Sequence, residues 1–138
     1  MSLKVEKSIY DQLAATSAVT ALVSTNIFFG NAAEGTAFPY ITLIRISTDA
    51  VPVSSGANTN KTTNATIQVD IFARTYSSAK NVAGEVRTSL YGFSDAGGDP
   101  QLAPTLLVGE FDDMDEPKTG RGRPIYRVSQ DYSVWFAD

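Results

Sequence analysis

The chain has 138 residues, a formal net charge of −4 at pH 7, 43% hydrophobic residues and 19% charged residues. This length and composition predict one globular domain over residues 1–138, and the net negative charge disfavours a general nucleic-acid-binding surface. Cysteine and histidine are both absent, which excludes disulfides and thiolate chemistry and removes the commonest general base and the commonest zinc ligand.

Neither end of the chain nor its interior contains a recognisable membrane or export segment. The N-terminal residues MSLKVEKSIYDQL lack the uninterrupted apolar run of a signal peptide. No window approaches the roughly 20 apolar residues that a membrane helix needs. We therefore expect a soluble protein that is made and kept in a cytoplasm and has no membrane partner.

The first third of the chain predicts two helices and one strand. Val5, Ile9 and Leu13 recur at helical spacing, so residues 2–15 are expected to form a helix with one apolar face. A short second helix is expected directly after it. Residues 41–47 are rich in β-branched side chains and predict the first strand.

A long polar segment, residues 48–63, separates this strand from the next one. It is rich in serine, threonine, asparagine and glycine, which is typical of a connection between two antiparallel strands. A loop of such length in a compact domain is either functional or disordered.

The centre of the chain carries its two clearest periodicities. Apolar residues alternate with polar ones from Ala65 to Ala73, which predicts a strand with one buried face. The period then changes, and apolar residues at i, i+3, i+4, i+7 and i+11 predict a helix that ends near Leu90. Ser77 or Ser78 is the expected N-cap of this helix. After its end, Gly92 is the expected left-handed residue.

The last third predicts two more strands. One covers residues 105–111. The other covers residues 126–136, where Tyr126, Val128, Tyr132, Val134 and Phe136 share one face. Between them, the charged segment DDMDEPKTGRGRP, punctuated by glycine and proline, is expected to be a solvated hairpin loop.

These elements together predict an α+β domain. Strands that are joined without an intervening helix favour hairpins. We therefore expect an antiparallel sheet of about four strands with the helices packed on one face, in the order α-(α)-β-β-α-β-β.

The acidic cluster Asp112, Asp113, Asp115 and Glu116 is the one candidate for metal binding, because carboxylate oxygens are ligands for Ca²⁺ and Mg²⁺. Its spacing does not match a calcium-binding EF-hand loop, and basic residues follow it closely. We therefore interpret these acids as solvated charges and predict no catalytic residue, no metal and no cofactor.

Two aromatic residues interrupt otherwise polar strand faces. Phe72 lies on the polar side of the central strand, and Trp135 lies on the polar side of the last strand. Such a side chain is either packed under a loop or buried by another subunit, and both alternatives remain open from sequence alone.

Three motifs in order carry a family resemblance. Pro39-Tyr40 precedes the first strand, Gln68 to Tyr76 reads QVDIFARTY, and Tyr126 to Trp135 reads YRVSQDYSVW. With the N-terminal helix and the segment SAVTALVSTNIFF, this set resembles the tail-terminator or tail-completion proteins of long-tailed bacteriophages and prophages. The resemblance covers nearly the whole chain.

The resemblance implies a non-enzymatic structural protein. Its copies would form a hexameric ring that caps the head-proximal end of the tail tube, ends tail polymerisation and provides the surface on which the head docks. The implied partners are other copies of the chain, the tail tube protein and head–neck connector proteins, and double-stranded DNA would pass through the lumen without specific binding. The implied location is the bacterial host cytoplasm during assembly and the virion tail afterwards.

Residues expected at a subunit or tube interface come from the polar strand faces, the long loop and the charged segment: Phe72, Trp135, Val51, Val53, Asn60, Lys61, Asp112, Asp113, Asp115, Arg121 and Arg123. Two alternatives remain open. One is a head-side neck adaptor of similar fold, and the other is a small metal-binding or ligand-binding α+β domain that uses residues 112–116.

Overall fold

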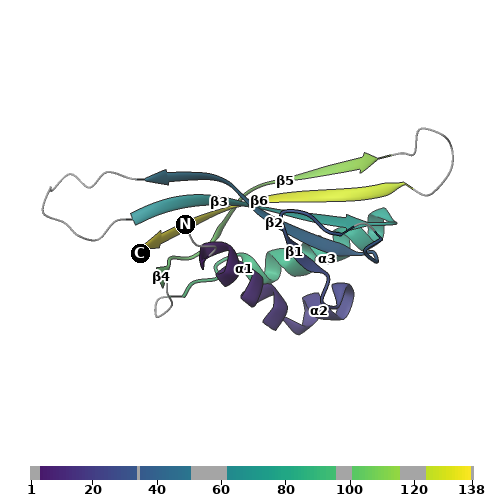
Figure 1. Ribbon diagram of the computed structural model, residues 1–138, viewed down its shortest axis with the longest axis horizontal. Helices are drawn as coiled ribbons and strands as arrows, with labels where there is room; N and C mark the ends of the chain where they lie inside the picture. The colour runs from purple at the N-terminus through teal and green to yellow at the C-terminus, as the bar shows by residue number, and fades with distance from the viewer. Residues whose placement is uncertain (1–3, 34, 51–61, 96–100, 116–123, 138) are drawn as a thin grey trace, which may run out of the picture.

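A computed structural model describes residues 4–33, 35–50, 62–95, 101–115 and 124–137. It has two layers, a curved sheet and a set of helices that cover one of its faces (Figure 1). The elements are α1 (Lys4–Ala15), α2 (Ser17–Val23), β1 (Ile27–Phe29), β2 (Tyr40–Ala50), β3 (Thr62–Ala73), α3 (Tyr76–Leu90), β4 (Gln101–Leu102), β5 (Leu106–Asp115) and β6 (Ile125–Ala137).

The six-stranded sheet has the order β1-β2-β3-β6-β4, and β5 also pairs with β6. The β2–β3, β3–β6, β5–β6 and β4–β6 pairs are antiparallel, whereas β1 and β2 are parallel. The α+β class is confirmed. The expectation of about four antiparallel strands is wrong, because β1 and β4 have only three and two residues and are too short to show a period in the sequence.

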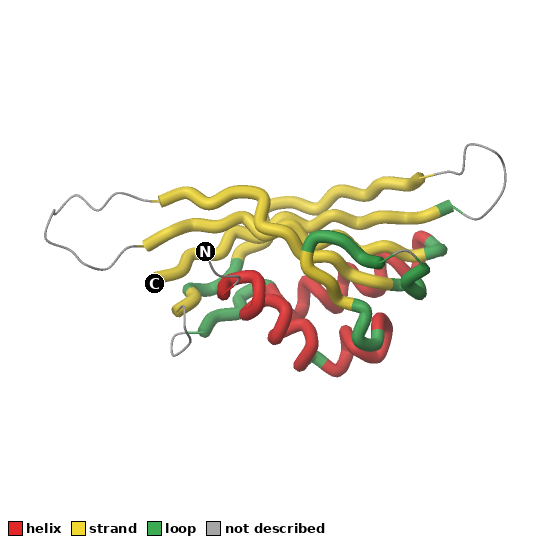
Figure 2. The backbone as a smooth tube through the Cα atoms, viewed as in Figure 1, coloured by secondary structure: helices red, strands yellow, loops and turns green. Residues whose placement is uncertain are grey.

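The hairpins are longer than the apolar alternation indicated. Strand β2 continues to Ala50 and β3 begins at Thr62, so residues 48–50 and 62–63 of the expected loop are paired backbone, and residues 51–61 lie outside the described residues. Strand β5 continues to Asp115. Ladder hydrogen bonds join backbone groups and do not need apolar side chains, which is why polar residues extend both hairpins. The β2–β3 and β5–β6 hairpins point toward opposite ends of the sheet (Figure 2).

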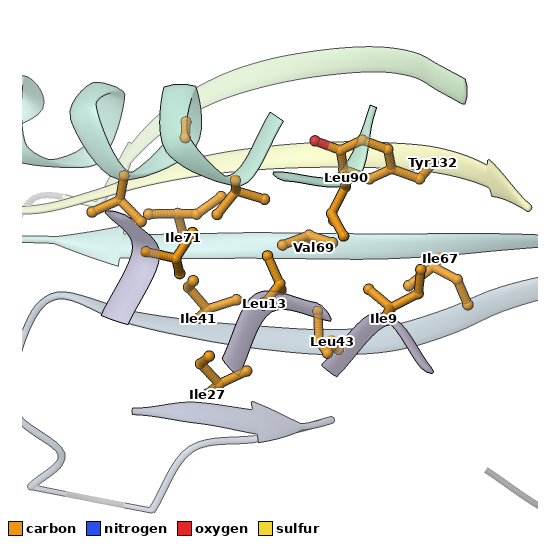
Figure 3. Packing of buried hydrophobic residues seen from close by; sticks show 14 of the residues in the cluster. Ile9, Leu13, Ile27, Ile41, Leu43, Ile67, Val69, Ile71, Leu90 and Tyr132 are labelled. Carbon is orange, nitrogen blue, oxygen red and sulfur yellow. The ribbon is translucent and has the colours of Figure 1, made fainter. Parts of the chain in front are cut away.

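The core lies between the helices and the covered face of the sheet. The inward residues of β3, among them Ile67, Val69 and Ile71, are fully buried. Ile9 and Leu13 of α1 reach toward this face from the helical layer (Figure 3). The predicted alternation of β3 and the apolar stripes of α1 and α3 are thus confirmed.

The ends of α3 follow capping rules, although the N-cap differs from the predicted one. The side-chain oxygen of Thr75 accepts a hydrogen bond from the backbone N–H of Ser78 at 3.1 Å. The helix begins at Tyr76, two or three residues earlier than a cap at Ser77 or Ser78 implied, so the preceding Thr75 takes the capping position. Gly92 has a φ of 81°, as predicted for the residue after the helix.

Two β-bulges interrupt the ladders on either side of the central strands. In β2 the register shifts between Arg45 and Ser47, and in β5 it shifts between Leu107 and Gly109. The extra residues are Ile46 and Val108. A bulge bends its strand and re-aims the extra side chain, and both of these side chains are exposed.

Candidate assembly surface

The sheet face that the helices leave uncovered, called the open face below, is polar along its centre. The cross-strand register of β3 and β6 there places Gln68 opposite Asp131 and Asp70 opposite Ser129. The Ser129 hydroxyl donates to the Asp70 carboxylate. Asn64 donates to the Ser133 hydroxyl at 2.7 Å, diagonally across the β3–β6 ladder. These side chains are arranged to bond with one another as well as with water.

Asp131 is the unusual group in this polar centre. Its Oδ1 is buried and has no hydrogen-bond partner within the described part of the chain. Burial raises the pKa of Asp131, the nearby Asp70 carboxylate raises it further, and a hydrogen bond from Gln68 opposes both effects. The open face therefore holds one carboxylate whose ionisation the fold disfavours.

Phe72 lies at one end of the open face in a cluster of rings. Its ring stands edge-on to Tyr40 at a centroid distance of 4.8 Å, and Tyr40 in turn lies 5.1 Å from Phe38. Phe72 is half-buried, so its own subunit provides part of its packing. A hollow of about 230 Å³ lies beside the cluster, lined by Tyr40, Phe72, Asp113, Met114, Ile125 and Arg127.

Trp135 lies toward the other end of the open face, opposite Asn64 of β3. It is also half-buried. The two aromatic residues that the sequence singled out are therefore both on the polar face, as predicted, but Phe72 lies eight positions along β3 from Asn64, the partner of Trp135. They do not form one site.

The acidic residues of the charged segment lie on a strand, which corrects the expectation of a hairpin loop. Asp112, Asp113 and Asp115 pair through their backbones with β6. The Asp113 carboxylate accepts from Arg127 at 3.2 Å, and Asp112 accepts from the Tyr76 hydroxyl at 2.7 Å. Asp112 and Asp113 are thus partnered by described neighbours on α3 and β6, whereas Glu116 lies outside the described residues.

One lysine of α3 joins two carboxylates of β5. Lys80 Nζ lies 2.9 Å from Glu110 and 3.2 Å from Asp112. Burial acts to raise the pKa of Glu110, but hydrogen bonds from Lys80 and Gln130 outweigh it and the net pKa is lowered. The hydrogen bond from Tyr76 is the main cause that lowers the pKa of Asp112, and Lys80 adds to it. We call Lys80, Glu110 and Asp112 the lysine clamp.

A buried polar chain continues the lysine clamp into the core. Gln130 is fully buried and donates to Glu110 at 2.7 Å and to the backbone oxygen of Ala83 at 3.0 Å. The Tyr132 hydroxyl donates to Gln130 Oε1 at 2.6 Å, and burial raises the pKa of this phenol. Polar contacts of Glu110 and Asp112 therefore attach β5 to α3 and β6, in addition to the apolar packing of Leu107 against the core.

The outer edges of the sheet carry exposed apolar side chains that the sequence analysis missed. We call Leu106, Val108, Phe111 and Met114 the β5 edge. We call Ile44 and Ile46 of β2, with Phe29 of the neighbouring β1, the β2 edge. The exposed fractions of these side chains run from 40% to 66%. A hollow of about 310 Å³ lies at the β2 edge, lined by Glu6, Phe29, Gly30, Leu43, Ile44 and Arg45. A signal existed in the run from Ile41 to Ile46, which has isoleucines at both odd and even positions and thus on both faces.

Six of the predicted interface residues, Val51, Val53, Asn60, Lys61, Arg121 and Arg123, lie outside the described residues. Within the described ranges, no group of three or more acidic residues is placed to hold a metal ion. None of the helices in those ranges has the length and hydropathy of a membrane-spanning segment.

Comparisons with known proteins give a family from the sequence and a shared fold from solved structures. A sequence model of the family described as tail completion protein gp17 matches residues 7–137. No curated protein matches the chain. A chain in the solved structure titled "Virion of native gene transfer agent (GTA) particle" has 20% sequence identity and a TM-score of 0.69, and the match covers 94% of this chain and 92% of that chain. A second solved structure has 16% identity and a TM-score of 0.53, with 97% and 96% covered.

Proposed function

This chain belongs to the tail completion protein gp17 family, and on that premise we propose that its copies form a ring, of six subunits as the resemblance implies, that caps the head-proximal end of a phage tail tube. The ring would end polymerisation of the tube and offer the surface on which the head docks. The observation that carries the proposal is the family match over residues 7–137. The fold shared with a chain of a virion particle supports it.

The proposed mechanism is surface complementarity without catalysis. The open face, with Phe72 and Trp135, and the acidic strand β5 are the candidate surfaces toward other copies, the tube protein and the head–neck connectors. Half-buried aromatic residues on such a face are the kind that interfaces favour. The assembled protein would be a virion component that is put together in the bacterial host cytoplasm.

Double-stranded DNA would pass through the lumen of the ring without being held. The chain carries a net charge of −4, and a negative protein does not retain phosphates electrostatically. A ring whose lumen is lined mainly by arginine and lysine would contradict this part of the proposal.

The experiment that tests the function adds the purified chain to its tube protein during polymerisation. We expect the tube lengths to stop increasing once the chain is present, and electron microscopy should show a ring at one tube end only. A neck adaptor of similar fold would bind head connectors and leave tube growth unchanged, so unchanged tube lengths would overturn the proposal. Light scattering of the chain alone across a concentration series reports whether rings form without the tube.

A further inference from the structure

We propose that neighbouring copies of this chain join edge to edge, with the β5 edge of one copy against the β2 edge of the next. The inference rests on the ring of the proposed function and names the two surfaces that would build it. Strands β2 and β5 lie on opposite sides of the β3–β6 pair, so one subunit carries both halves of the contact.

Within the described part of the chain, both edges have backbone groups without a strand partner on their outer side. Within the described ranges, β5 pairs only with β6. Strand β1 covers β2 only as far as Leu43, whose carbonyl accepts a last hydrogen bond from Gly30 at 2.7 Å. The rest of β2, from Ile44 to Ala50, has no outer neighbour in that part of the chain. Such edges are templates for pairing with another strand.

Most of the exposed large apolar side chains of the described residues lie on these two edges. Ten large hydrophobic residues of the described part are exposed, and seven of them belong to the β5 edge or the β2 edge. Single exposed apolar residues are normal on a protein surface, but their concentration on the outer strands favours a contact there. Each edge therefore offers apolar area together with open hydrogen-bonding groups.

Strands β2 and β5 each contain one bulge that presents an apolar side chain. Ile46 is 50% exposed and Val108 is 66% exposed, and each is the extra residue of its bulge. A bulge locally interrupts the ladder and re-aims its extra side chain, and a charged residue there would blunt the edge further. Here both are apolar, which suits a contact.

The residues at the two edges also differ in the sign of their charge. The sequence of β5, LLVGEFDDMD, has four acidic residues and no basic one. Beside the β2 edge, Arg45 pairs with Glu6 of α1 and balances its charge. The exposed Lys4 and Lys7 stand on the first turns of the same helix, where the positive end of the helix dipole also lies. The acidic strand of one copy would face the basic end of α1 of the next. Because Glu110, Asp112, Asp113 and Lys7 are already paired within their own subunit, this adds only a weak long-range attraction to the contact.

The unpaired backbone groups and exposed apolar side chains of the two edges favour a second copy of the chain as the occupant of each edge. The two edges differ from each other, so their contact is head-to-tail, and a head-to-tail contact builds a ring when its rotation closes. A two-fold dimer would instead need one edge to match itself.

Cross-linking tests the pairing directly, because the chain has no native cysteine. We would prepare Ile46→Cys, Val108→Cys and the double variant, and treat each with a short bismaleimide. The double variant is expected to give a ladder of oligomers that ends at the ring. A mixture of the two single variants is expected to give dimers only, and each single variant alone is expected to remain monomeric.

Other outcomes overturn the inference. Dimers from a single variant alone, at the yield of the mixture, would show a two-fold contact. A double variant without a ladder would show that copies do not meet at these edges, and tube termination by the same protein would then leave the proposed function standing. If the ladder forms but the same protein does not terminate tubes, the edge-to-edge contact stands and the proposed function fails.

A substitution pair gives a second readout. Replacing both Val108 and Phe111 by threonine places β-branched side chains with high strand propensity at both positions but removes apolar area from the β5 edge. Assembly is then expected to need a roughly tenfold or higher concentration, which corresponds to about 1.4 kcal/mol per contact. Tyr91→Thr is the matched control, because Tyr91 is 60% exposed and lies on neither edge. Equal assembly of the two variants, with melting temperatures unchanged, would contradict the proposal.

Discussion

Strands β3 and β5 both pair antiparallel with neighbours in the same sheet and both run along β6, yet they are held by different forces. In β3 every second residue from Ala65 to Ala73 is fully buried under the helices. In β5 the side chains of Val108 and Phe111 are more than 60% exposed, and the inward Glu110 meets a lysine. Equal backbone ladders therefore do not imply equal roles: β3 builds the core, and β5 presents a surface.

The largest expected effect separates the two strands by stability. Ile71→Ala in β3 removes fully buried methyl groups and is expected to lower the free energy of unfolding by about 3 kcal/mol. Phe111→Ala in β5 removes a larger side chain that is 62% exposed, and a change within about 0.5 kcal/mol is expected. Urea unfolding of both variants at a concentration where the chain is monomeric checks this contrast, which equal losses would break.

A smaller effect is expected at the buried polar link between β5 and β6. Gln130→Met keeps the volume but leaves the Tyr132 hydroxyl without its acceptor, so the free energy of unfolding should fall by about 2 kcal/mol. Adding Tyr132→Phe removes the orphaned hydroxyl. In a double-mutant cycle the two changes should therefore couple by about 1 kcal/mol. Additive losses would mean that the link does not act as a unit.

The smallest effect is expected at the lysine clamp and depends on pH. The folded-state pKa values of Glu110 and Asp112 are lowered from 4.5 and 3.8, so their contribution is present above those values and is lost as the pH falls through the folded pKa values. Lys80→Met should cost about 0.5 kcal/mol near pH 7, since the clamp is partly exposed and screened.

The measurement compares thermal unfolding of the wild type and Lys80→Met at several pH values and low salt. The difference between them should shrink as the pH falls through the lowered pKa values of Glu110 and Asp112, and it should vanish only below both of them. Lys7→Met is the matched control, because the Lys7–Asp11 pair is fully on the surface of α1. A difference that stays constant with pH would show that Lys80 contributes through packing of its aliphatic stem.

The sequence predicted the buried half of the molecule well, because burial leaves a period. The alternation around Ile67 and the stripe that includes Val82 identified β3 and α3, and four of the five inward residues predicted for β6 are buried. Three motifs in chain order also led to the family that the comparison supports.

The exposed half could not be predicted in the same way. Strands β1 and β4 are shorter than one full alternation, and the acids from Asp112 onward resemble a loop because charged residues are rare in strands. The β5 edge has no period to detect, since its exposed apolar residues occupy both faces and a bulge. Glu110 of β5 and its partner Lys80 are 30 residues apart in sequence, so only the folded chain shows their contact.

The one-sided pairing of β5 has a consequence for hydrogen exchange. In an antiparallel ladder, successive backbone amides of a strand point alternately to its two sides. Those of β5 that point toward β6 are hydrogen-bonded, whereas every second amide points away from the sheet. An isolated subunit should therefore show β5 as alternating slow and fast positions, with exchange at the fast ones limited only by solvent. Protection of the fast set on assembly would mark the arrival of a neighbouring strand, amide by amide.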